Sequence, residues 1–236
     1  MLIHNALEDE RFHDNPLVSE APHIRFYAGQ PIRSADGHAL GTLCLIDREP
    51  RTLDNDDLAA LADLAEMVEA EFRALHDAST DLLTGLSNRR GFHAIAEHLI
   101  AAFSRMDQPA SMVFVDLDRF KQINDVHGHD EGDRALVDTA NVLLSTFRCS
   151  DAVARLGGDE FAILCAHSGD VDGVLHRLNE AFDAHNKSAG RLYDIEYSTG
   201  VIAFDPQRHH SIGDLLKEAD MRMYDDKERR RATRAK

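Results

Sequence analysis

The sequence predicts an α+β protein in which helices pack on the faces of an antiparallel central sheet. Two short apolar runs, 152–154 and 161–166, flank a Gly-Gly pair and predict a tight hairpin, because glycine accepts the positive φ angles of such turns. Amphipathic stretches alternate with these and other apolar, β-branched runs along residues 81–236. The sequence has no internal repeat. Strands and helices mixed in this way around a hairpin are typical of an antiparallel sheet covered by helices.

Composition and charge describe an ordinary globular protein. Of 236 residues, 43% are hydrophobic and 29% are charged. The net charge of −16 argues against a surface that coats nucleic acid. The apolar runs are far shorter than the ~20 residues that span a bilayer, and no signal peptide is recognisable. Cys44, Cys149 and Cys165 are scattered. We therefore expect a cytoplasmic protein with buried free thiols, no membrane span and no nucleic-acid partner.

Residues 1–53 are expected to form only part of a domain. Strands are predicted at 24–28 and 40–47, with a turn at 29–31 and a hairpin loop at 34–38. This stretch resembles the closing hairpin of a GAF domain, whose opening half we expect to be missing. Because half a sheet cannot bury both its faces, the segment needs a partner or begins further upstream. A truncated sensor and a working small-molecule receptor both remain open.

Residues 54–80 are predicted to form a linker helix with Asp54 as its N-cap. Its apolar positions are separated by alternating steps of three and four. Such a stripe fits a heptad seam of a coiled coil, and it also fits an amphipathic helix lying on its own sheet. Both interpretations stay open for the stripe, which comprises Leu58, Leu61, Ala65, Val68, Phe72 and Leu75.

Residues 81–236 are predicted to form the main domain. Its expected helices lie at about 88–106, 119–125, 131–147, 170–187 and 212–231, and its expected strands at 111–117, 195–204 and on both sides of the Gly-Gly pair.

Two carboxylates beside the hairpin turn suggest a cation site. Asp159 and Glu160 are adjacent at the mouth of an apolar strand, where they repel each other and lose hydration unless a cation lies among them. A solvated acidic hairpin tip is the alternative. Upstream, another apolar strand ends in Asp116-Leu117-Asp118 before a polar helical turn, which repeats the same arrangement.

Together these motifs resemble the GGDEF family of diguanylate cyclases, which condense two GTP into cyclic di-GMP. The resemblance runs from about Asp81 to Arg231 and includes the opening stretch Asp-Leu-Leu-Thr-Gly-Leu-Ser-Asn-Arg-Arg at 81–90. It implies a fold similar to nucleotidyl cyclases and polymerase palms, and a homodimer that holds one GTP in each protomer. A non-catalytic nucleotide-binding or scaffold module is the alternative, but such members usually have damaged glycine or acidic positions. Those positions are intact here.

The resemblance implies that each half-site uses two Mg²⁺ ions, which Mn²⁺ could replace. Asp116, the Leu117 carbonyl, Asp159 and Glu160 match its metal-holding positions, and Asp159 also matches the position of the general base, with Glu160 beside it. Mg²⁺ prefers hard oxygen ligands of this kind.

The resemblance also places the substrate. Asn124 and Asp133 match guanine-reading positions, since an amide and a carboxylate complement the two edges of that base, and His129 lies in the same segment. The remaining substrate-binding positions are the hairpin glycines Gly157 and Gly158 and the triphosphate-contacting Lys121, Lys227 and Arg231. For these cations, helix-surface charges are the alternative.

A last motif, Arg148-Cys149-Ser150-Asp151, is separated from Gly157 by five residues. In the family, this motif at this spacing forms an inhibitory site where the arginine holds cyclic di-GMP. A basic helix end followed by an Asp that opens a turn is the alternative.

Overall fold

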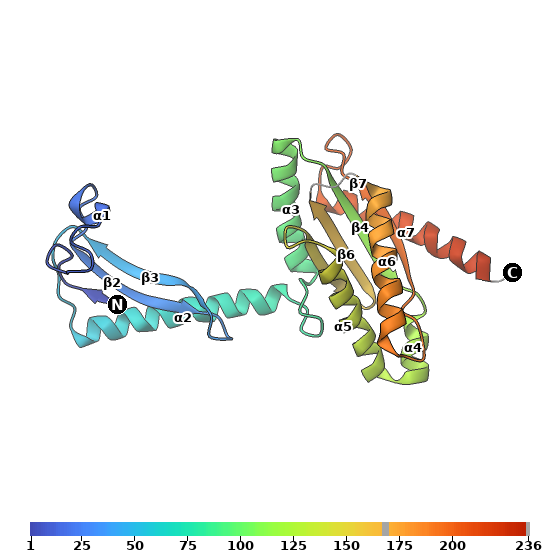
Figure 1. Cartoon of the computed structure of the whole chain (residues 1–236), viewed down its shortest axis with the longest axis horizontal. Coiled ribbons are helices and arrows are strands. Elements are labelled where there is room, and N and C mark those ends of the chain that lie inside the picture. Colours follow the sequence, from blue (N-terminus) through green and yellow to red (C-terminus); the bar gives the residue numbers. More distant parts are fainter. Residues whose placement is uncertain (167–169, 235–236) are drawn as a thin grey trace. The chain divides into compact units, whose positions relative to one another are not determined.

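The computed structural model describes residues 1–166 and 170–234, apart from the side chains of 231, 233 and 234. The chain divides into two compact units, Met1–His76 and Asp77–Lys236. Each contains an antiparallel sheet, and helices flank the sheet of the second unit, which confirms the predicted α+β class (Figure 1). None of the helices within the described ranges is long and apolar enough to cross a membrane.

The first unit contains a three-stranded sheet with the order β1-β2-β3. Its strands are β1 (Leu2–Ile3), β2 (Phe26–Arg33) and β3 (Ala39–Asp47). A one-turn helix, α1 (Pro16–Ser19), precedes β2, and the long α2 (Asn55–Ser79) follows β3. Both strands and the linker helix predicted here are therefore present, whereas the short β1 was not predicted.

The predicted turn at 29–31 is wrong, because β2 continues through it. Pro31 pairs with Thr42 of β3, whereas β1 pairs only with Tyr27 and Ala28. At Pro31 the other side of β2 is therefore an open edge. Proline lacks an N–H group, but no neighbouring strand on this side needs that donor.

The apolar stripe of α2 divides between two environments. Leu61 is buried and packs against Phe26 and Ala28 of β2, as expected of a helix lying on its own sheet. Phe72 and Leu75, further along the same stripe, are exposed. Leu61 and Ala65 of the stripe are thus buried within the unit, and a coiled coil remains a prediction for the exposed positions.

The cysteines differ from expectation in their exposure. All three are free, but only Cys165 is buried. Cys44 is exposed because most of β3 is uncovered, and Cys149 is exposed because it lies in a surface turn. Burial raises the pKa of the Cys165 thiol to about 12.

The second unit contains a four-stranded antiparallel sheet with the order β5-β6-β4-β7. Its strands are β4 (Ala110–Leu117), β5 (Ala152–Gly157), β6 (Glu160–Ala166) and β7 (Tyr197–Ala203). The strand β4 lies between β6 and β7 and is buried along its whole length. Residues at the end of β4 therefore lie at the centre of one edge of the sheet.

Within the part of the chain that the structure describes, five helices flank this sheet (Figure 1). They are α3 (Arg89–Met106), α4 (Phe120–His127), α5 (His129–Thr146), α6 (Val171–Ala189) and α7 (Ile212–Arg234). Alternate residues of the strands point to opposite faces, so α5 and α6 pack on one face and α3 and α7 on the other.

The predicted boundaries hold to within a few residues, and α5 begins two residues earlier than expected. Gly128, with φ of 89°, separates α4 from α5 and allows an abrupt change of chain direction.

Helix α7 lies close against β7 because Gly200 has no side chain. A β-carbon at Gly200 would lie 2.0 Å from the backbone oxygen of Ala219 and 2.5 Å from the backbone nitrogen of Met223. Both atoms belong to α7, so a side chain here would push the helix away from the sheet. The position of Lys227, further along α7, depends on this contact.

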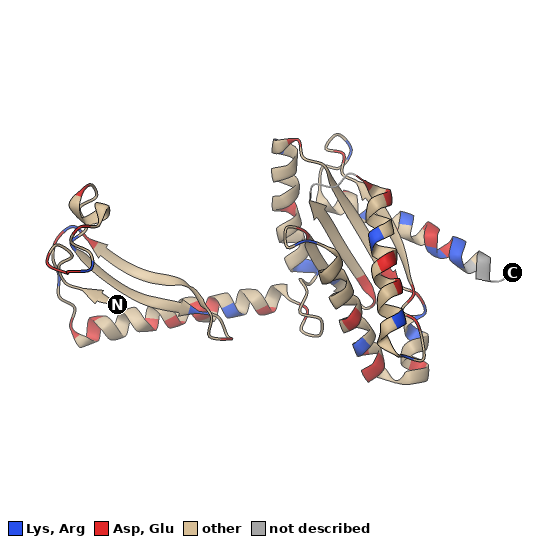
Figure 2. Cartoon of the chain, viewed as in Figure 1, with Lys and Arg blue, Asp and Glu red and all other residues tan. Residues whose placement is uncertain are grey.

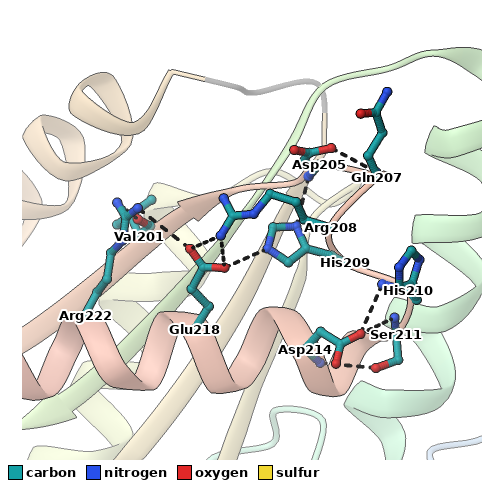
Figure 3. Close-up of polar contacts among 10 residues, drawn as sticks. All are labelled: Val201, Asp205, Gln207, Arg208, His209, His210, Ser211, Asp214, Glu218 and Arg222. Carbon is teal, nitrogen blue, oxygen red and sulfur yellow. Dashed lines mark hydrogen bonds and ion pairs between the residues drawn. The ribbon is translucent and has the colours of Figure 1, made fainter.

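The loop that leads into α7 is fixed by polar contacts (Figure 3). The Asp205 amide donates to Nδ1 of the buried His209 over 3.0 Å, so Nε2 carries the proton and donates to Glu218 over 3.0 Å. Arg208 also donates to Glu218. The His209 hydrogen bond is the largest of the influences that lower the pKa of Glu218. These contacts fix the start of α7, whose far end carries the basic residues visible in Figure 2.

Candidate active site

The hairpin turn lies one residue later than the sequence suggested. Gly158 and Asp159 form the turn, while Gly157 is the last residue of β5 and pairs with Glu160. Both glycines have positive φ angles, 146° at Gly157 and 54° at Gly158. Residues with a β-carbon rarely adopt these conformations. The glycines therefore place Asp159 within the turn itself.

The four predicted metal-holding residues meet where β4 ends and β6 begins. Asp116 pairs directly with Glu160 across the two antiparallel strands. The Leu117 amide donates to the Asp159 carbonyl over 3.2 Å, which ties the hairpin turn to the end of β4. Directly opposite residues in such a ladder have their Cβ atoms about 5 Å apart, so the carboxylates of Asp116 and Glu160 can reach a common ligand.

These carboxylates are held under mutual repulsion. Asp116 is only 8% exposed. The pKa of Asp159 is raised, first by burial and then by the charge of Asp116. Burial is also the largest cause of the raised pKa of Glu160; Arg89 opposes it, while Asp116 and the nearby Asp220 add to it. A bound cation would relieve this repulsion.

Two cationic side chains neutralise part of this charge. Lys227 of α7 forms an ion pair with Asp116, and its side chain is only 21% exposed. Arg89, the first residue of α3, lies 3.3 Å from the Glu160 carboxylate and donates from Nε to the Leu156 carbonyl over 3.2 Å.

The donor set fits a hard divalent cation in part. The oxygens of Asp116, Asp159 and Glu160 are the kind that Mg²⁺ or Mn²⁺ binds. Among the described residues, however, no three His, Cys, Asp or Glu side chains are arranged as a complete ion site. Substrate phosphate oxygens would have to complete the coordination shell.

The predicted guanine-reading residues lie on α4 and α5. Asn124 is half-buried against Gly132: a β-carbon at that glycine would lie 1.9 Å from the Asn124 side-chain oxygen. Asp133 follows Gly132 directly and is exposed. The Asn124 side chain therefore lies beside Gly132 of α5, the residue that precedes Asp133. Lys121 of α4 and His129 of α5 are also exposed.

The predicted inhibitory motif forms a well-defined turn between α5 and β5. One oxygen of Asp151 accepts from the Arg148 amide over 2.8 Å, and the other accepts from the Ala166 amide over 2.8 Å. Asp151 therefore has the turn-forming role of the alternative interpretation, while the Arg148 side chain is exposed on the same turn. Arg231 lies in α7, but its side chain is outside the described residues.

Sequence reasoning missed the residues that connect the hairpin to the start of the domain. Arg155 is 13% exposed; its guanidinium lies 3.1 Å from Asp81 and donates to the Gly158 carbonyl over 2.8 Å. The Arg155 amide donates to the Ser87 carbonyl. A charged residue inside an apolar strand was the available signal for Arg155, and the opening motif at 81–90 contained both Asp81 and Arg89.

A cavity of about 460 Å³ lies beside α4 but contains none of the residues predicted to contact GTP. Most of the predicted substrate contacts are instead exposed, namely Lys121, His129, Asp133, Gly157 and Gly158. The cavity is lined by Asp118, Arg119, Gln122, Ile123, Val126, His127, Leu192, Tyr193, Asp194 and Glu196.

Comparison with known proteins agrees with the geometry. Residues 78–233 match the family described as "Diguanylate cyclase, GGDEF domain", and residues 1–72 match the GAF domain family. Diguanylate cyclase DgcP of Escherichia coli is 30% identical over 232 residues, which cover 89% of this chain and 66% of DgcP. Diguanylate cyclase TpbB of Pseudomonas aeruginosa is 36% identical over 188 residues, which cover 76% of this chain and 43% of TpbB. The chain thus spans less than two thirds of the length of either relative.

A solved structure shares the fold. The coiled coil and GGDEF domain of DgcB from Caulobacter crescentus, crystallised in complex with c-di-GMP, matches with a TM-score of 0.66 and 25% sequence identity. The match covers 72% of this chain and 92% of that one. Since the family match extends over most of the chain and includes the glycine turn with its carboxylates, this protein belongs to the GGDEF family.

Proposed function

We propose that this chain is a diguanylate cyclase that condenses two GTP into cyclic di-GMP and two pyrophosphates. One observation carries the proposal: Asp116 and Glu160 face each other across β4 and β6, beside Asp159 in a glycine turn. Raised pKa values at Asp159 and Glu160 accompany this arrangement, so the site favours a cationic ligand.

Each half-reaction joins a ribose 3′-oxygen to the α-phosphorus of the other GTP and breaks the bond to the leaving pyrophosphate. Asp116, the Leu117 carbonyl, Asp159 and Glu160 would hold Mg²⁺ or Mn²⁺, which supplies charge neutralisation for the phosphates and acidifies the attacking hydroxyl. Asp159, which matches the family's general-base position, accepts the hydroxyl proton on its carboxylate.

The remaining predicted residues select and orient GTP. Asn124 and Asp133 read the two edges of guanine from adjacent places on α4 and α5. The triphosphate is held by the cations Lys121, Lys227 and Arg231, and the bare backbone of Gly157 and Gly158 lets it approach the turn closely.

Activity requires a homodimer. Each domain carries one set of these residues and holds one GTP, so two domains must face each other with two-fold symmetry to bring each 3′-hydroxyl to the opposing α-phosphate. The exposed second half of the α2 stripe is available to align two protomers, and we expect the dimer to work in the cytoplasm.

The test is a turnover assay on the full chain with Mg²⁺. GTP should give pyrophosphate and cyclic di-GMP, and ATP should not replace it. Asp159→Ala should reduce turnover by at least about 100-fold, the usual cost of losing a group that acts in the transition state. Unchanged turnover in this variant would show that the site is wrongly assigned. GTP binding without product in the wild type would favour a scaffold module.

Product inhibition is proposed at Arg148 and Asp151. Asp151 fixes the turn, so Arg148 is presented to solvent from a rigid backbone, where its guanidinium can hold phosphate or guanine of cyclic di-GMP. Arg148→Ala should remove inhibition by product while leaving the initial rate nearly unchanged. If that variant instead loses its initial activity, Arg148 is structural.

A further inference from the structure

We propose that Arg89 is a built-in counter-cation for Glu160, which holds this carboxylate in the metal-free protein and competes with the divalent cation that binds there. The proposal rests on the proposed function only in treating Glu160 as a metal ligand. It adds to the active site a residue at the start of α3, beyond the residues already assigned to metal or substrate.

The backbone of Arg89 is fixed in place. Asn88, the N-cap of α3, accepts from the Gly91 amide over 3.0 Å, and its own amide group donates to the carbonyls of Ala78 and Thr80. Arg89 follows as the first residue of the helix. The side chain of Asn88 therefore holds the start of α3 against the segment that precedes it.

The guanidinium of Arg89 bridges the hairpin strands. Nε donates to the Leu156 carbonyl on β5 over 3.2 Å, and a terminal nitrogen donates to the Glu160 carboxylate on β6 over 3.3 Å. One side chain thus anchors both strands at the point where they leave the turn. A compact ammonium group could neutralise the carboxylate, but it lacks this forked geometry.

A cation at this position interacts unfavourably with the helix dipole. The N-terminus of a helix carries partial positive charge and favours acidic residues, yet the first turn of α3 has none and begins with two arginines. Helix stability therefore does not account for Arg89. Local features that oppose a propensity rule are often explained by function, and the neighbouring carboxylate supplies that explanation.

The ion pair is exposed enough to exchange. The Arg89 side chain is 56% exposed and that of Glu160 is 39% exposed, whereas the Lys227–Asp116 pair is far more buried, at 21% and 12%. Exposed pairs are weak. An entering divalent cation can therefore displace Arg89 from Glu160. The charge repulsion between Asp116 and Glu160 favours binding of that cation.

The proposal predicts that loss of the Arg89 charge tightens metal binding. Arg89→Gln removes the charge but keeps an N–H donor for the Leu156 carbonyl. Binding of Mn²⁺ to the full chain is measured by electron paramagnetic resonance with a saturating non-hydrolysable GTP analogue, whose phosphates complete the coordination shell. We expect the dissociation constant of Arg89→Gln to fall about two- to fivefold, the range for a weak exposed ion pair.

Two variants are matched controls. Arg89→Lys keeps the charge and should bind Mn²⁺ about as the wild type does. Arg90→Gln removes an equal charge from the same helical turn, where Arg90 is exposed and contacts no carboxylate of the site in the described structure. It should leave the dissociation constant nearly unchanged. Melting temperatures establish that each variant is folded.

A double-mutant comparison locates the effect. With Glu160→Gln already present, Arg89→Gln should no longer tighten Mn²⁺ binding, because the carboxylate for which the two cations compete is gone. An unchanged or weakened Mn²⁺ affinity in folded Arg89→Gln would overturn the proposal. So would a loss of GTP affinity alone, which would make Arg89 a phosphate contact. Because these titrations need no turnover, their outcome is independent of whether the wild type makes cyclic di-GMP.

Discussion

The Gly158–Asp159 turn separates two groups of carboxylates with opposite electrostatics. On one side, burial alone would raise the pKa of Asp81, but hydrogen bonds from Thr84 and the Arg155 guanidinium outweigh it and lower that pKa. On the other side, burial and mutual repulsion raise the pKa values of Asp159 and Glu160. The two groups are connected through Arg155, which also holds the Gly158 carbonyl.

The difference separates structure from function within one hairpin. The charge of Asp81 is satisfied by the protein itself, so this aspartate stabilises the fold. The site carboxylates are satisfied only in part by Lys227 and Arg89, and their remaining charge opposes folding until a cation arrives. The free energy that the Asp81 contacts contribute to folding thereby offsets the cost of holding the repelling site carboxylates together.

The largest effect is expected from removing Lys227, the half-buried cation of the site. Lys227→Met removes the ion-pair partner of Asp116, and Asp116 is itself only 8% exposed. The same change removes a proposed contact to the triphosphate. We expect turnover to fall about 100-fold, as when one charge-stabilising donor is removed from an active site. Steady-state rates with GTP measure this. Lys217→Met on the same helix is the matched control, and an equal loss there would mean that only the net charge matters.

The second prediction breaks the connection between the two groups. Arg155→Met leaves Asp81 and the Gly158 carbonyl without their guanidinium donor. Unsatisfied groups of this kind cost about 2–3 kcal/mol in total, so the melting temperature should fall by about 5–10 °C for a domain of this size. Calorimetry measures it. A melting temperature within a degree of the wild type would show that Arg155 does not link the groups.

The main features of the sheet were predictable because they depend on local patterns. Apolar runs gave the strands at 111–117 and 161–166, and the glycines gave the hairpin between β5 and β6. The turn at 29–31 was mispredicted because the tolerance for Pro31 depends on how far β1 extends beside β2. That extent is a tertiary fact, which no local pattern contains.

The identities of the site residues were predictable from short sequence motifs, but the contacts between these residues depend on packing and were not. Asp116 and Glu160 were singled out separately, but their direct pairing follows from the register of β4 and β6. The contacts from Arg89 and Arg155 link residues more than 60 positions apart, as their separations of 67 and 74 show. The closeness of Gly132 to Asn124 depends on how α4 and α5 pack.

The third prediction concerns a variant that keeps all of these carboxylates and changes only the proposed contact between Asn124 and guanine. In Gly132→Ala, the new β-carbon would meet the Asn124 side-chain oxygen, the mobile end of a side chain, so Asn124 should turn away at little cost to the fold. We expect KM for GTP to rise about tenfold, the loss of roughly one good hydrogen bond to the base, with kcat and melting temperature little changed. In contrast, Gly200→Ala meets backbone atoms and should lower the melting temperature. If both variants lower it equally, Gly132 is a packing residue.

The smallest expected effects are changes of stability in metal-free buffer, which should have opposite signs when Asp81 and Asp159 are neutralised. Folding lowers the pKa of Asp81 below its ordinary value of 3.8, so its stabilising contribution is present above that pH and is lost as pH falls through the lower folded-state pKa. Asp81→Asn should therefore cost about 1 kcal/mol at pH 7, and this difference from the wild type should shrink as the pH is lowered below about 4. Asp159→Asn removes a repelled charge and should instead raise the melting temperature slightly at pH 7. Thermal unfolding of both variants measures the two signs, and a fall in both melting temperatures at pH 7 would remove the distinction between a structural and a functional side of the turn.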